Sequence, residues 1–145
     1  MRVVFDTNIL VLYLIGGGPA KSILKAALLD IPEKPLSFFY SPDMMTEYTE
    51  TLNKLPEKRP DIFFPQDIAA LLRDVAARGR LVYPTITLTG NPDACSHEPD
   101  NRFLECAAAC RANYIVTVNT RHFPDIFRGI KTVAPSQFYE IVFVD

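Results

Sequence analysis

Short apolar segments alternate along the chain with longer stretches in which apolar residues recur every three to four positions. The short segments predict five strands, at residues 3–5, 36–40, 81–83, 114–118 and 130–133. The longer stretches predict helices at residues 19–30, from Ser41 to a point before Pro56, at 66–78 and at 100–111. Residues 55–65 and 84–99 are predicted as loops. Residues 135–142 fit either a helix or a strand, and the apolar run 141–144 favours the strand.

This order of elements predicts the fold class. Strands that alternate with helices and consist of continuous apolar runs are typical of a parallel sheet covered on both faces. A length of 145 residues suits one domain. We therefore expect a single α/β domain over residues 1–145, a three-layer α/β/α sandwich with a mainly parallel central sheet. In such folds a ligand binds beyond the carboxyl ends of the strands, where the strand order reverses.

Composition and charge narrow the class of function. Hydrophobic residues make up 48% of the chain and charged residues 22%, which is enough apolar material for a buried core. The longest apolar run, residues 9–15, is far shorter than the roughly 18 residues of a membrane span, so we expect no membrane partner. The net charge is −2. Binding of nucleic acid mainly through an overall positive charge of the protein is therefore excluded. Any contact with phosphate must be local or bridged by a metal ion.

The start of the chain and the cysteines predict a cytoplasmic protein. Asp6 stands where a signal peptide needs apolar residues. Three cysteines, Cys95, Cys106 and Cys110, are an odd number, and the last two lie four apart in an Ala-rich helical stretch, where small buried thiols are common. Cys95 and His97 would supply only two of the four ligands of a zinc site. We therefore expect the cysteines to be free thiols that pack in the interior, in a protein of a reducing compartment.

Three acidic residues lie where chemistry is expected. Asp6 directly follows the first strand, Glu47 lies in the second turn of the helix after the second strand, and Asp100 opens the helix before the fourth. Glu47 and Asp100 also fit ordinary roles, as a solvated helix residue and as an acid that favours a helix dipole. Carboxylates gathered in one crevice repel one another and need a cation or a proton. Mg²⁺ or Mn²⁺ is the expected occupant, because both prefer oxygen ligands.

Four motifs, in order along the chain, resemble those of the PIN (PilT N-terminus) domain family. They are VVFDTNIL at 3–10, SPDMMTEYTETL at 41–52, EPDNRFLECA at 98–107 and YIVTVNTRHFP at 114–124. Within that family the chain is most similar to the toxin components of toxin–antitoxin systems. The resemblance runs through nearly the whole chain and implies a PIN-like, Rossmann-like fold.

The resemblance also implies roles for individual residues. Asp6, Glu47 and Asp100 match the acidic metal ligands, and Asn119 stands where many relatives carry a fourth acid. His122 departs from the pattern, since relatives often have Asp before this Phe. Thr7, Asn8 and Thr117 are expected to orient the carboxylates by hydrogen bonds. Glu105 is five residues past Asp100, about 140° round the helix, which indicates a supporting or surface acid and not a ligand. Lys21, Lys25, Arg102 and Arg121 lie near the motifs, where they would either contact phosphates or form a solvated charged face.

The implied activity is metal-dependent hydrolysis of RNA phosphodiester bonds, with Mg²⁺ or Mn²⁺ as cofactor. The implied partners are an RNA substrate, a cognate antitoxin protein and a second copy of the chain in a homodimer. Some aromatic residues must lie in the core, and those left exposed would suit a dimer face; the candidates are Phe63, Phe64, Phe127, Phe138, Tyr139 and Phe143. Two other readings stay open. A phosphatase of the haloacid-dehalogenase type would need an Asp at position 8, where this chain has Asn8. A catalytically silent module would bind RNA or protein on the same scaffold.

Overall fold

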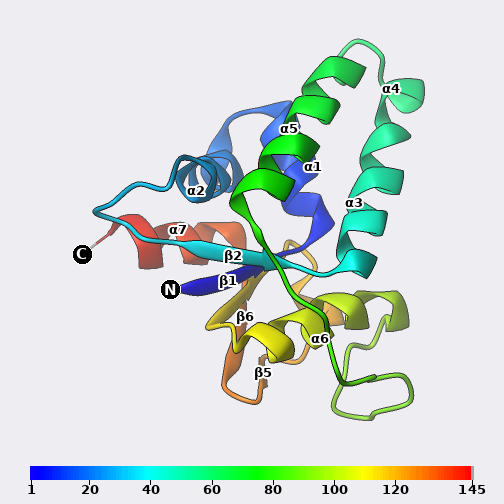
Figure 1. The fold of residues 1–145 in the computed structure, drawn as a ribbon, viewed down its shortest axis with the longest axis vertical. Helices are drawn as coiled ribbons and strands as arrows, with labels where there is room; N and C mark the ends of the chain where they lie inside the picture. Colours follow the sequence, from blue (N-terminus) through cyan, green and yellow to red (C-terminus); the bar gives the residue numbers. More distant parts are fainter. Residues whose placement is uncertain (145) are drawn as a thin grey trace.

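The computed structural model describes residues 1–144, and a six-stranded sheet of order β3-β2-β1-β4-β6-β5 lies at its centre (Figure 1). All neighbouring strands are parallel except β5 and β6, which form an antiparallel hairpin. The strands are β1 (Arg2–Phe5), β2 (Ser37–Tyr40), β3 (Arg80–Leu81), β4 (Tyr114–Val116), β5 (Ile126–Phe127) and β6 (Ile130–Val133). The predicted mainly parallel sheet is confirmed.

Helices cover both faces of this sheet, as expected for an α/β/α sandwich. They are α1 (Thr7–Ile15), α2 (Gly18–Leu29), α3 (Pro42–Asn53), α4 (Leu55–Lys58), α5 (Pro65–Arg78), α6 (Asn101–Cys110) and α7 (Pro135–Phe143). Figure 1 shows α6 on one side of the sheet and α1 and α2 on the other. Two short 3-10 turns, Glu98–Asp100 and Thr120–His122, precede α6 and follow β4.

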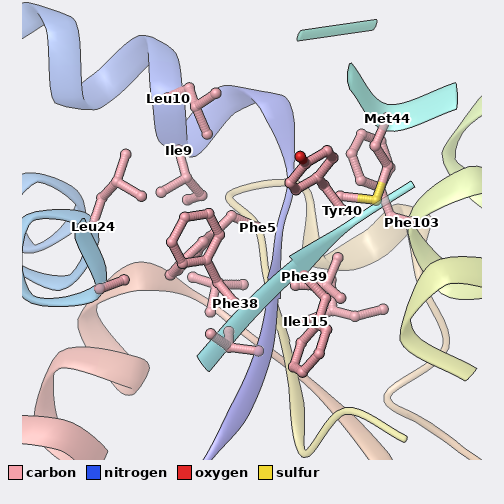
Figure 2. Packing of buried hydrophobic residues seen from close by; sticks show 14 of the residues in the cluster. Phe5, Ile9, Leu10, Leu24, Phe38, Phe39, Tyr40, Met44, Phe103 and Ile115 are labelled. Carbon is pink, nitrogen blue, oxygen red and sulfur yellow. The ribbon is translucent and has the colours of Figure 1, made fainter. Parts of the chain in front are cut away.

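Alternating side chains of the central strands build the core on both sides of the sheet. In Figure 2, Phe38 lies with Phe5, Ile9 and Leu24 on the side of α1 and α2, and Ile115 lies on the opposite side. The Phe5 ring is 5.9 Å from that of Phe38. These side chains are at most 4% exposed, so the strands that carry the site are held rigidly.

Of the two alternatives for residues 135–142, the helix is correct and the favoured strand is wrong, because this segment lies in α7. Pro135 stands at the first helical position, where its missing N–H costs nothing. The Ala134 N–H donates a 2.8 Å hydrogen bond to Gln137 Oε1, which caps the helix start. Phe138 and Val142, four residues apart, are both buried on one face of the helix. The Phe138 ring lies 6.4 Å from that of Phe5, so α7 covers the sheet.

Other differences from the predicted elements are local. α1 was not predicted, since its nine residues are almost all apolar and show no helical period. The two-residue β5 and the four-residue α4 were also missed, the latter inside a predicted loop. Cys106 and Cys110 are buried in the core as predicted. Three aromatics considered for an exposed dimer face are buried instead: Phe63, Phe127 and Phe138.

Within residues 1–144, no single helix has the length and apolar character of a membrane span. Only α1 and α2 taken together have that length and apolar character, and the chain bends by 104° at the break between these two helices.

Candidate active site

The strand order reverses between β1 and β4. From β1 the chain builds β2 and β3 on one side of it, and then crosses over to add β4 on the other side. Asp6 directly follows β1, and Thr117 directly follows β4. The Asp6 N–H donates a 3.0 Å hydrogen bond to the Val116 carbonyl, so the sheet fixes the backbone at this point. The point where the strand order reverses is where α/β proteins typically bind ligands.

Asp6 is buried and accepts three hydrogen bonds. Its side chain caps the start of α1, where Oδ1 accepts from the Thr7 N–H at 2.6 Å. Oδ2 accepts from Thr117 Oγ1 at 2.6 Å and from Asn8 Nδ2 at 3.1 Å. The hydrogen-bonding partners predicted for Asp6 are confirmed. Together they hold the carboxylate in one orientation.

The charge on Asp6 is nevertheless unfavourable. Burial, together with the negative charges of Asp100 and Glu47, raises the pKa of Asp6 from 3.8 to about 6, although the bonds from Thr117 and Thr7 act in the opposite direction. Asp100 and Glu47 are therefore both close enough to Asp6 to disfavour its negative charge. A cation between them would relieve this repulsion.

Glu47 is held beside Asp6 by contacts between α3 and the end of β1. α3 begins at Pro42, and Ser41 Oγ caps it by accepting from the Met44 N–H at 3.2 Å. Thr7 Oγ1 donates a hydrogen bond to Glu47 Oε2, so Thr7 contacts two of the three acids. The next residue of α3, Tyr48, donates through its hydroxyl to the Phe5 carbonyl.

Arg102 lies on the other side of Glu47. Its Nε is 3.7 Å from Glu47 Oε1, and both side chains are partly exposed. Its guanidinium also donates to the carbonyl oxygens of Pro99 and Asp43. Arg102 thus links the start of α6 to the start of α3 and places a positive charge at the edge of the acidic group.

Asp100 is paired with His122. Asp100 ends the turn Glu98–Asp100 and its side chain is 13% exposed. Its Oδ2 lies 3.1 Å from His122 Nδ1, and the ring of His97 lies 5.3 Å from that of His122. Sequence reasoning missed this pair. Its only signal was the departure of His122 from the motif, which does not show which residue the ring would contact.

The side chains of two other predicted residues form no hydrogen bond with the three acids within residues 1–144. Asn119 is exposed, and within residues 1–144 it forms hydrogen bonds only through its backbone, including a 3.0 Å bond from its N–H to Thr117 Oγ1. Glu105 Oε2 accepts a 2.7 Å bond from the Leu88 N–H and so fixes the long loop before α6.

The PIN domain model matches residues 2–121, most of the chain and all of the acids described above. This chain belongs to the PIN domain family. A search of curated proteins found no match. Among solved structures, this PIN domain is similar to a chain in the crystal structure of VapBC2 from Rickettsia felis bound to a DNA fragment from their promoter. The TM-score is 0.59 at 16% identity, over 92% of this chain and 98% of the other, which supports the fold.

The donor chemistry of the PIN domain site fits a hard divalent cation, because Asp6, Glu47 and Asp100 all supply carboxylate oxygens. The raised pKa of Asp6, with burial as its largest cause, shows that the buried charge is under-compensated without one. In the part of the chain that the structure describes, no group of three or more His, Cys, Asp or Glu residues lies in an arrangement that could hold a metal ion. Mg²⁺ keeps several of its waters when it binds to proteins, so it needs few direct protein ligands.

Proposed function

We propose that this PIN domain is a metal-dependent endoribonuclease that hydrolyses RNA phosphodiester bonds. The observation that carries the proposal is Asp6, a buried carboxylate at the point where the strand order reverses, with its pKa raised to about 6 by burial and by the charges of Asp100 and Glu47. Proteins rarely bury acids that repel one another unless a cation or a reaction requires it. Membership of the PIN family supports the same conclusion.

Asp6, Glu47 and Asp100 would hold Mg²⁺ or Mn²⁺, with Asn119 at the rim. When bound, the ion would supply Lewis-acid stabilisation of the charge that develops on the phosphate and would favour attack by water. The chain's own residues orient the acids. Thr7 holds Asp6 and Glu47 together, and His122 holds Asp100.

We also propose a role as the toxin of a toxin–antitoxin pair in the cytoplasm. The support is the motif resemblance and the similarity of the fold to a chain of the VapBC2 structure. A toxic ribonuclease should arrest the growth of a bacterial host when its expression is induced, and Asp6→Asn should remove the arrest at equal protein level. Equal growth arrest by both proteins would contradict the role.

The proposed homodimer would use apolar side chains that the fold leaves exposed at α1, α2 and α7. Ile15 is 52% exposed, Leu29 60% and Ile141 39%. Exposed apolar residues on neighbouring helices suit contact between two copies of a chain. Light scattering coupled to size exclusion should give twice the chain mass of 16.3 kDa. A monomer at high concentration would contradict the dimer.

The alternative is a catalytically silent module that binds RNA or protein. The exposed Asn119, which forms no hydrogen bond with the acids in residues 1–144, favours it. The two functions differ in their response to metal. The ribonuclease should cut a labelled single-stranded RNA in Mg²⁺ or Mn²⁺ and stop in EDTA. Binding of the RNA without cleavage in either metal would favour the silent module, and cleavage that persists in EDTA would contradict metal dependence.

A further inference from the structure

A pocket of about 680 Å³ lies beside the acids, between the loop at residues 91–96, the turn Thr120–His122 and the hairpin of β5 and β6. Its volume falls within the range of about 300–1,000 Å³ that is typical of ligand sites. The Ser96 N–H donates a 2.9 Å hydrogen bond to the His122 carbonyl, which joins two of the three segments. The site described above uses only one residue of this lining, His122.

Two arginines give the pocket a local positive charge. Arg121 and Arg128 both line it and are exposed, and within residues 1–144 neither forms an ion pair. The Arg128 guanidinium lies 5.2 Å from the centre of the Phe127 ring, so the aromatic ring helps to position it. Asp93 is the acidic residue of the lining. The whole chain carries a net charge of −2, so these two guanidinium groups are a local concentration of positive charge on an otherwise acidic protein.

His122 connects the pocket to the proposed catalytic acids. It lines the pocket, and its Nδ1 lies 3.1 Å from Asp100 Oδ2. One side chain, that of His122, therefore lies between the pocket and Asp100. The same lining includes Ile126, which is 59% exposed, and Pro124, so the pocket also has an apolar wall.

We propose that this pocket binds one nucleotide of a single-stranded RNA, next to the phosphodiester that water would hydrolyse at the site of the three acids. Arg121 and Arg128 would bind backbone phosphate, for which the planar guanidinium is well suited. The base would pack on Ile126 and Pro124. A base reaches such a pocket only when it is unpaired and unstacked, which makes single-stranded RNA the substrate class. This inference rests on the proposed ribonuclease function.

Nucleotide binding in EDTA tests the pocket without catalysis. The probes are adenosine 5′-monophosphate and an RNA trinucleotide, titrated into the full chain by calorimetry. The double variant Arg121→Gln/Arg128→Gln should weaken trinucleotide binding at least about tenfold, because hydrogen bonds to charged groups are lost. The matched control is Arg73→Gln/Arg78→Gln, which removes the same charge from exposed positions of α5 and should change binding less than about twofold. Melting curves should show that both variants are folded.

Each outcome separates this inference from the proposed function. Arginine-dependent nucleotide binding by a protein that never cleaves RNA would support the pocket and contradict the ribonuclease. Metal-dependent cleavage with unchanged trinucleotide binding in Arg121→Gln/Arg128→Gln would contradict the pocket alone. An equal loss of trinucleotide affinity in Arg73→Gln/Arg78→Gln would show a general effect of charge and would overturn the proposal that the pocket binds a nucleotide. Binding of a glutamate-rich peptide but of neither nucleotide probe would also overturn it.

Discussion

Thr117 Oγ1 donates a 2.6 Å hydrogen bond to Asp6 Oδ2, joining two buried residues that lie 111 positions apart in the sequence. The bond connects the ends of β1 and β4, where the strand order reverses. It favours the charged form of Asp6 in a place where burial and two neighbouring acids disfavour it. The orientation and the ionisation of Asp6 therefore both depend on Thr117.

Replacing this hydroxyl should destabilise the protein. Thr117→Val removes the donor to Asp6 and keeps nearly the same shape, so a buried acceptor loses its partner. The free energy of unfolding at pH 7.5, measured with urea, should fall by about 1–3 kcal/mol. Thr117→Ser keeps the hydroxyl, so its free energy of unfolding should fall by less than that of Thr117→Val. If Thr117→Val were as stable as wild type, the hydrogen bond from Thr117 to Asp6 would contribute nothing measurable to stability.

The raised pKa of Asp6 predicts an unusual dependence of stability on pH. Because the pKa of Asp6 is about 6 in the folded protein and 3.8 is its ordinary value, the folded state holds more protons than the unfolded state between these pH values. The contribution of Asp6 to stability should therefore fall as pH rises through this window. In EDTA, the free energy of unfolding of wild type, relative to that of Asp6→Asn, should fall by on the order of 2 kcal/mol between pH 4 and pH 7.5.

The quantity to measure is the difference between wild type and Asp6→Asn in how the free energy of unfolding changes with pH. The stability of Asp6→Asn at a single pH does not test the pKa. An Asn amide has a single oxygen, whereas Asp6 accepts three hydrogen bonds on two oxygens. The variant therefore loses some hydrogen bonding at every pH, and this cost cancels from the slope. Parallel urea-unfolding curves for the two proteins from pH 4 to pH 7.5 would show that Asp6 has an ordinary pKa.

Metal ions should stabilise the wild type more than Asp6→Asn. A ligand at about 100 times its dissociation constant adds about 2.7 kcal/mol, or roughly 5–10 °C in the melting temperature for a domain of this size. Scanning calorimetry with and without Mn²⁺ gives the shift for each protein. An equal shift in both would place the bound Mn²⁺ away from Asp6.

Much of the site could be predicted because its residues follow recognisable local patterns. Asp6 comes directly after a buried strand, and Ser41 with Pro42 marks the start of the helix that carries Glu47. The parallel order of the strands then brings their carboxyl ends to one edge. Nothing more than alternating strands and helices is needed for that inference.

The features that could not be predicted depend on contacts between distant segments. His122 and Asp100 lie 22 residues apart, and no local pattern indicates that their side chains meet. α1 lacks a polar face because it is covered by neighbouring helices, so its sequence has no helical period. For α7, a run of β-favouring residues suggested a strand, but burial of Phe138 and Val142 on one face decides for a helix.

Gly79 gives a prediction about the fold. It ends α5, but its φ of −72° is one that any residue adopts, so helix termination does not require glycine here. A Cβ at this position would lie 2.7 Å from Phe38 Cε2 and 2.7 Å from the Val75 carbonyl oxygen. Gly79→Ala should therefore cost about 1–3 kcal/mol of stability in urea unfolding. Arg80 is the exposed residue next to Gly79, and Arg80→Ala should lower the free energy of unfolding by less than about 0.5 kcal/mol. A Gly79→Ala variant as stable as wild type would show that α5 can shift away from β2.

The rate of RNA cleavage in Glu47→Gln, compared with that in Glu50→Gln, tests the central claim most directly. Both residues lie on α3 and both changes remove one negative charge, but Glu50 is exposed and Glu47 contacts Thr7 beside Asp6. With a labelled single-stranded RNA in Mg²⁺, Glu47→Gln should lower the rate by at least about 100-fold, the upper end of what even outer partners of a metal site cost. Glu50→Gln should stay within about twofold of wild type. Equal rates in Glu47→Gln and wild type would contradict the assignment of these acids as the catalytic site.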